Sequence, residues 1–202
     1  MISTDFTFEN LRGRLIMFDD CCHLIRSTVR LSCVMLFKRS FQICEIVGEN
    51  AEVHGATIFK SHISEFLNLF PEDEILAEER TTIHEMADLD FVFCLNRAST
   101  SQPLLEHELS HVLFHYDAEH RRAVYELWEA IEDISRVTCE TYLKDCGYKE
   151  EEFVDEFFAS FFQGYRELVP LIPEIQPLYE RTKRRIEDAA WELSHGVLDY
   201  RK

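Results

Sequence analysis

The chain has 202 residues, of which 46% are hydrophobic and 29% charged, and this length supports a single domain with a substantial apolar core. Its formal net charge of −17 opposes binding to nucleic-acid phosphates and to anionic membrane surfaces, because both interactions depend on Lys and Arg. Composition therefore predicts a globular protein that binds neither nucleic acid nor membrane.

The first half of the sequence carries two clear element patterns. The spacing of apolar residues predicts a helix over 58–70 that ends at Pro71. The segment from Asp90 to Leu95 is short, apolar and rich in aromatic and branched residues, which predicts a strand. Residues 9–47 carry mixed helical and extended patterns, so no element boundaries are assigned there.

Helical patterns dominate the second half. A helix capped by the polar run before it is expected over 103–116. A long amphipathic helix is expected over 119–143, stopping near Gly147. Further helices are expected over about 150–165 and 178–195. The predicted fold class is therefore α+β, with a small strand region followed by a helix-dominated half.

The chemistry is carried by the segment His107-Glu108-Leu109-Ser110-His111 within the helix expected over 103–116. Residues i and i+4 of a helix lie on one face, so His107 and His111 can bind the same cation, and zinc prefers such nitrogen ligands. Glu108 projects beside the two ligands, where its carboxylate can take a proton from the attacking water. The pattern predicts one zinc ion and a hydrolytic reaction.

A hydrolytic zinc ion normally has three protein ligands and one open position, so a third ligand must come from elsewhere in the chain. The helix expected over 150–165 offers an acidic face opposite an aromatic one. The acidic face holds Glu152, Asp155 and Glu156, and the aromatic face holds Phe153, Phe157 and Phe161. Unpaired buried carboxylates are costly, and a zinc ion with its two histidines would account for this acidic face.

The histidine segment, the short strand before it and a later acidic helix that contains Phe158-Ala159 resemble the gluzincin metallopeptidases. Within them they are most similar to the compact ImmA/IrrE-type domain, in which a glutamate in a Glu-x-x-Ala-Asp pattern is the third ligand. Aligning the family's Phe-Ala pair with Phe158-Ala159 implies that Glu152 is this ligand and Glu156 its partner one turn later. The resemblance covers about residues 90–165, and it implies one zincin-like metallopeptidase domain over 1–202.

Several other residues stay open as the third ligand. Glu151, Asp155 and Glu156 are alternatives to Glu152, because a slip of register along the helix exchanges them. Asp117 is a further alternative, since its spacing from the histidines is that of some short proteases, although those have Gly where this chain has Phe114. The last two alternatives are His115 and His120. The donor to the oxyanion of the tetrahedral intermediate also stays open among Tyr116, Tyr148, Tyr165 and His195.

These patterns predict a zinc metallopeptidase that cleaves peptide bonds in a protein substrate. The alternative is a regulatory or interaction protein that keeps the metallopeptidase fold and acts by binding a partner. The seven cysteines form no CxxC pair and favour a reducing compartment, and the N-terminal segment lacks the pattern of a signal peptide. A cytoplasmic protein is therefore expected, with delivery by a specialised secretion system and the oligomeric state left open.

Overall fold

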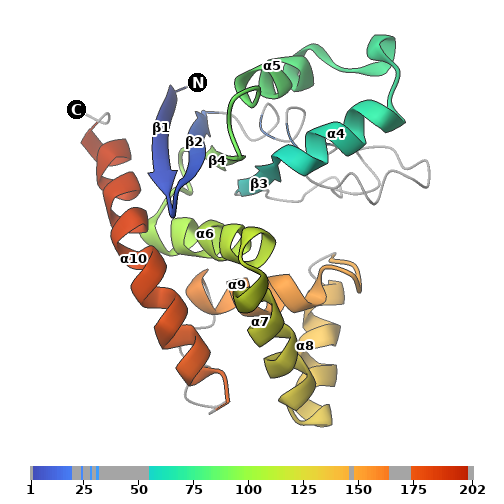
Figure 1. Ribbon diagram of the computed structural model, residues 1–202, viewed down its shortest axis with the longest axis vertical. Coiled ribbons are helices and arrows are strands. Elements are labelled where there is room, and N and C mark those ends of the chain that lie inside the picture. The colour runs from blue at the N-terminus through green and yellow to red at the C-terminus, as the bar shows by residue number, and fades with distance from the viewer. Residues whose placement is uncertain are drawn as a thin grey trace. The chain divides into compact units, whose positions relative to one another are not determined.

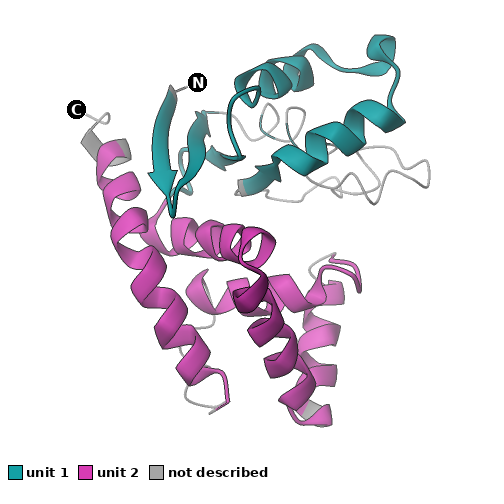
Figure 2. Ribbon diagram, in the orientation of Figure 1, with its two compact units in different colours: residues 1–100 teal, residues 101–202 magenta. Residues whose placement is uncertain are grey.

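The computed structural model describes residues 2–19, 24, 28, 31, 55–145, 148–163 and 174–199. The chain divides into two compact units, residues 1–100 and residues 101–202, which Figure 2 shows in different colours. The first unit contains a four-stranded sheet and the second is helical in its described residues. This arrangement confirms the predicted α+β class.

The sheet of the first unit has the strand order β1-β2-β4-β3 (Figure 1). Its strands are β1 (Ile2–Phe8), β2 (Leu11–Phe18), β3 (Gly55–Phe59) and β4 (Phe91–Asn96). β4 lies parallel to β2 and antiparallel to β3, and β1 and β2 form an antiparallel hairpin. The strand predicted at 90–95 is therefore confirmed as β4, an inner strand whose residues Phe91–Leu95 are all buried.

The β1–β2 hairpin turns through Glu9 and Asn10, whose φ angles are 47° and 70°. Two consecutive positive φ values are typical of the type I′ turn, whose twist matches that of the two strands and which favours Asn. At Gly13 on β2, a Cβ atom would lie 2.5 Å from the Phe91 ring and 2.8 Å from the Phe6 ring. Glycine at this position therefore lets the two aromatic rings close over the strand.

The helices of the first unit pack against one face of the sheet and form an apolar core with it. These helical elements are α4 (Lys60–Leu69), the 3-10 helix η1 (Glu72–Glu74) and α5 (Ala77–Glu85). Ile16, Val92 and Cys94 of the sheet belong to the same buried cluster as Phe66 of α4. The helix predicted over 58–70 starts two residues too early, because Ile58 and Phe59 pair with β4 as part of β3; it does end before Pro71.

The second unit contains five described helices. They are α6 (Gln102–Tyr116), α7 (Ala118–Ala130), α8 (Asp133–Asp145), α9 (Phe153–Gln163) and α10 (Gln176–Asp199). α6 packs against α7, α9 and α10, and α9 also packs against α7 and α8. Within the described residues, no helix is long and apolar enough to cross a membrane.

The prediction of a single helix over 119–143 is wrong, because two helices, α7 and α8, occupy this region. The chain leaves the helical conformation at Ile131, which has φ −68° and ψ 136° and is 4% exposed. Burial of this side chain outweighs the continuous helical pattern of the sequence. The Arg136 guanidinium pairs with Asp133 at 2.6 Å and so stabilises the first turn of α8. The proposed cap at Gly147 lies outside the described residues.

Candidate metal centre

α6 is an interior helix. The hydroxyl of Ser101 caps its first turn by accepting the Leu104 N–H at 3.4 Å, in agreement with the capped start expected from the sequence. All residues from Leu104 to Leu113 are buried. His107, Glu108 and His111 are therefore held in a water-poor environment, where each charge needs a partner.

α9 is the second helix of the centre, and aromatic contacts fix its rotation. Phe157 packs edge-on against Trp128 of α7, with ring centroids 5.0 Å apart. Phe162 stacks on Tyr179 of α10 at 4.8 Å. With these large side chains turned toward α7 and α10, the carboxylates of the first turn of α9 are directed at α6.

His107, His111 and Glu156 come together as one buried group whose ligand atoms all lie within 4.8 Å of one another. The Nε2 atoms of the two histidines are 3.1 Å apart. Glu156 places Oε1 3.6 Å from His111 Nε2 and Oε2 3.8 Å from His107 Nε2. Glu156 Oε2 is buried and has no hydrogen-bond partner among the described residues.

This geometry fits a tetrahedral metal ion. Zinc bonds of about 2.0–2.1 Å imply separations of about 3.3–3.4 Å between neighbouring ligand atoms. The three measured separations, 3.1, 3.6 and 3.8 Å, lie close to that spacing. Two imidazole nitrogens and one carboxylate would supply three protein ligands to such an ion. A buried His107–His111–Glu156 group that could hold a metal ion is thus present.

Asp155 approaches His111 from the other side of its ring. Its Oδ2 lies 2.9 Å from His111 Nδ1, so the imidazole donates a hydrogen bond to the carboxylate. The two nitrogens of one histidine ring therefore face consecutive residues of α9, with Nδ1 toward Asp155 and Nε2 toward Glu156. Such a carboxylate–histidine pair is common behind metal ligands.

The two histidines have opposite protonation preferences. Burial, reinforced by the charge of His111, places the pKa of His107 well below 6.5. Burial also acts to lower the pKa of His111, but the carboxylates of Asp155 and Glu156 outweigh it and raise that pKa to about 10. Without a metal ion, His111 is therefore the protonated ring at neutral pH and donates from Nε2 to His107 Nε2.

Glu156 also holds a proton more tightly than an ordinary carboxyl group. Burial is the largest cause, and the neighbouring carboxylates Asp155, Glu108 and Glu152 add to it, raising the pKa of Glu156 to about 8 although His111 opposes the shift. The same burial that disfavours a free carboxylate here would favour one that binds a cation.

Glu108 and Glu152 take different places around this group. Glu108 is 4% exposed, and it lies close enough to His111 and Glu156 for its charge to raise the pKa of both. Glu152 does not belong to the His107–His111–Glu156 group, and its Oε2 accepts the backbone N–H of Lys149 at 2.9 Å. The structure therefore brings Glu156, one of the alternatives, and not Glu152, next to the two histidines.

A feature of the sequence points to Glu156 directly. Glu156-Phe157-Phe158-Ala159 matches the first four positions of the Glu-x-x-Ala-Asp pattern, with Ser160 in place of Asp, whereas the residue three positions after Glu152 is Asp155. Ala159 is fully buried, and its backbone interacts with His107. A small residue at this position allows α9 to approach α6 closely.

The other alternative ligands have different roles. Asp117 caps α7 by accepting the N–H groups of Glu119 and His120, each at 2.9 Å, and pairs with Arg185 of α10 at 2.8 Å. His115 and His120 likewise lie outside the His107–His111–Glu156 group. Glu151 is exposed in the turn before α9.

The structure does not single out an oxyanion donor. Tyr116 is 37% exposed at the end of α6, and its ring contacts that of His115. The exposed His195 stacks on Trp191 of α10 with ring centroids 4.0 Å apart. Tyr148 lies in the segment before α9, and Tyr165 lies outside the described residues.

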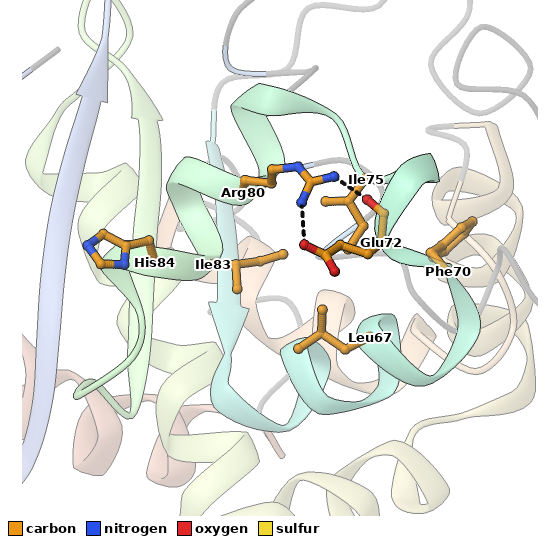
Figure 3. Close-up of a pocket in the computed structure, with 7 residues that line it drawn as sticks. All are labelled: Leu67, Phe70, Glu72, Ile75, Arg80, Ile83 and His84. Atoms are coloured by element: carbon orange, nitrogen blue, oxygen red, sulfur yellow. Dashed lines mark hydrogen bonds and ion pairs between the residues drawn. The ribbon is translucent and has the colours of Figure 1, made fainter.

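A pocket of about 400 Å³ lies in the first unit and is lined by none of the predicted site residues (Figure 3). Leu67, Ile75 and Ile83 form much of its apolar lining. Arg80 and Glu72 pair with each other at 3.3 Å at this pocket, so their charges are mutually compensated. The predicted site residues lie elsewhere, on α6 and α9 of the second unit.

Comparison with protein-family profiles, with curated proteins and with solved structures finds no match to this chain.

Proposed function

We propose that this protein is a zinc-dependent hydrolase of the metallopeptidase type, in which His107, His111 and Glu156 hold one ion. The observation that carries the proposal is the buried Glu156 carboxylate, whose two oxygens face the two imidazole Nε2 atoms and whose Oε2 has no hydrogen-bond partner in the described part of the chain. A buried group of this kind is costly unless a cation compensates it.

The choice of zinc follows from the donor set. Two imidazoles and one carboxylate suit zinc better than the oxygen-preferring cations magnesium and calcium. A zinc ion with three protein ligands supplies a Lewis acid and lowers the pKa of water at its fourth position.

Glu108 and Asp155 have separate roles in the proposed reaction. Glu108, next to the first histidine and buried at 4% exposure, would accept the proton of the attacking water and later donate it to the leaving amine. His111 would be oriented from behind by Asp155. A peptide bond in a protein is the proposed substrate, because a carbonyl polarised by the metal beside a general base is the arrangement used for amide hydrolysis.

The first experiment measures metal content and cleavage together. The wild-type protein and Glu108→Gln are loaded with zinc and incubated with a mixture of synthetic peptides of varied sequence, and the products are read by mass spectrometry. We expect one zinc ion per chain in both proteins and cleavage by the wild type alone, because Gln keeps the size of Glu but cannot accept a proton. Wild-type protein that binds no zinc would overturn the proposal.

The same variant separates the peptidase from a regulator that acts by binding a partner. Cells that carry Glu108→Gln are compared with cells that carry the wild-type protein. If the variant binds zinc and the two kinds of cell have the same phenotype, the Glu108 carboxylate is dispensable and hydrolysis is not the function. Loss of the wild-type phenotype in Glu108→Gln, with zinc content unchanged, supports the enzyme.

A further inference from the structure

We propose that Asp155 is a positioning residue for the metal centre, holding His111 with a proton on Nδ1 so that the lone pair of Nε2 points at the ion. This inference rests on the proposed metal site and names a residue that acts on it without binding the ion. The supporting contact is the 2.9 Å separation between His111 Nδ1 and Asp155 Oδ2.

The ring of His111 has only two nitrogens, and each has a distinct neighbour. Nε2 lies 3.1 Å from His107 Nε2 and 3.6 Å from Glu156 Oε1, so it belongs to the ligand group. A neutral imidazole carries one proton, and that proton must be on Nδ1 if Nε2 is to bind a metal. Asp155 is placed to accept a hydrogen bond from this Nδ1–H and therefore selects the tautomer that can bind.

The contact also fixes the plane of the ring. Side chains one residue apart on a helix diverge by about 100° around its axis. Asp155 and Glu156 nevertheless both approach His111, because its two nitrogens lie on different sides of one ring. Rotation of the imidazole about its Cβ–Cγ bond would break the Asp155 hydrogen bond, so α9 holds both the ligand atom and the ring that carries it.

Asp155 is not itself part of the ligand group. The carboxylate that joins the two histidines within 4.8 Å is that of Glu156. The Asp155 side chain keeps 26% of its surface exposed, against 17% for Glu156. Its loss should therefore weaken metal binding without removing a ligand.

The test compares zinc affinity in four variants by competition with a chromophoric chelator. Asp155→Leu and Asp155→Ala remove the hydrogen-bond acceptor, whereas Asp155→Asn removes the charge but keeps an oxygen acceptor. Glu151→Gln is the matched control, since it removes one exposed negative charge four positions earlier. We expect about 10- to 100-fold weaker zinc binding in the Leu and Ala variants, which is the usual effect of losing an outer-sphere partner. Asp155→Asn should bind zinc almost as tightly as the wild type. The affinity of Glu151→Gln should stay within about threefold of the wild-type value.

A second readout distinguishes positioning from a general effect on the fold. In the zinc-loaded wild type, nitrogen-15 NMR of the histidine side chains should show that the Nδ1–H of His111 exchanges slowly with solvent. That signal should persist in Asp155→Asn and in the Glu151→Gln control, and disappear in the Leu and Ala variants.

The two proposals can fail separately. If the wild type binds zinc but the Leu or Ala variant binds it as tightly as Glu151→Gln does, Asp155 has no positioning role. If the wild type takes up no zinc, the metal site itself is wrong and the role of Asp155 falls with it.

Discussion

The Nε2 atoms of His107 and His111 lie 3.1 Å apart in the buried interior of the second unit. One helical turn separates the two residues on α6, and their rings meet at an interplanar angle of 83°. With His111 protonated and His107 neutral, the metal-free pair shares one proton. A metal ion at this position would replace that proton and bind both rings.

The identity of the third ligand can be tested with Glu156→Gln. We expect zinc binding to weaken by more than the roughly 10- to 100-fold typical of losing an outer-sphere partner, because a neutral amide replaces the carboxylate ligand. Isothermal titration calorimetry against a competing chelator would measure the zinc dissociation constants of the wild type and the variant. Glu152→Gln is the control, since its amide oxygen can still accept the Lys149 N–H. A larger loss in Glu152→Gln than in Glu156→Gln would restore Glu152 as the ligand.

The stability of the metal-free protein should fall as pH rises from about 6.5 to 8. The folded chain raises the pKa of His111 from 6.5 to about 10 and that of Glu156 from 4.5 to about 8. Groups with a raised pKa in the folded state stabilise it below their unfolded pKa and lose that contribution as pH passes the folded value. The two losses overlap in this window and have the same sign.

Urea unfolding of chelator-treated protein at several pH values would measure this effect. Glu156→Gln should show a smaller loss, since the substituted side chain does not titrate. Metal-free protein that becomes more stable between pH 6.5 and 8 would contradict the protonation states derived for His111 and Glu156.

Zinc should stabilise the folded protein, and more so at higher pH. A ligand at 100 times its dissociation constant adds about 2.7 kcal/mol when it binds only the folded state. Because zinc must displace protons held by His111 and Glu156, its affinity should rise from pH 7 to pH 9. Thermal unfolding with zinc and with a chelator, at pH 7 and at pH 9, would measure the stabilisation by zinc and its dependence on pH. His107→Ala should abolish the stabilisation.

The position of α9 should depend on its aromatic side chains. Phe158 is 2% exposed and packs against the ring of His120 and against Phe162. Phe158→Ala should reduce the free energy of unfolding by about 3–5 kcal/mol through the cavity that it leaves. It should also weaken zinc binding, because Glu156 would lose its fixed position. Val137→Ala, at a side chain that is 59% exposed, should change stability by less than about 0.5 kcal/mol in the same urea titration.

Asp117 should be a structural residue. Asp117→Ala removes the cap of α7 and the ion pair with Arg185, and we expect a loss of about 0.5–2 kcal/mol of stability from the cap. Asp117→Asn should retain most of the cap. Both variants should bind zinc as the wild type does, and weaker zinc binding in Asp117→Asn, whose fold is kept, would reopen Asp117 as a ligand.

Local patterns were sufficient for several elements near the centre. The strand at 90–95 and the helix over 103–116 are observed within one residue as β4 and α6. Both have local causes, an apolar β-branched and aromatic run in one and a Ser cap with Pro in the first turn in the other. The β1–β2 hairpin lacks a clear strand pattern in the sequence, and Asn10 in its turn is the one local residue that favours it.

Two long-range effects were not visible in the sequence. The break between α7 and α8 depends on the burial of Ile131, while the residues around it keep a helical pattern. The strand assignment of Ile58 and Phe59 depends on pairing with β4, because the same residues also fit the helical spacing that follows. In both places tertiary contacts outweigh a weak local preference.

The sequence by itself determined that His107 and His111 share one helical face with Glu108 beside them, because helical periodicity is a local property of the chain. Only the tertiary structure decided which carboxylate meets them. Glu151, Glu152, Asp155 and Glu156 lie within six positions, and the rotation of α9 selects among them. That rotation is set by the packing of Phe157 on Trp128 and of Phe162 on Tyr179, contacts made with distant helices. The result places Glu156 next to the two histidine Nε2 atoms, Asp155 at His111 Nδ1 and Glu152 at the Lys149 backbone.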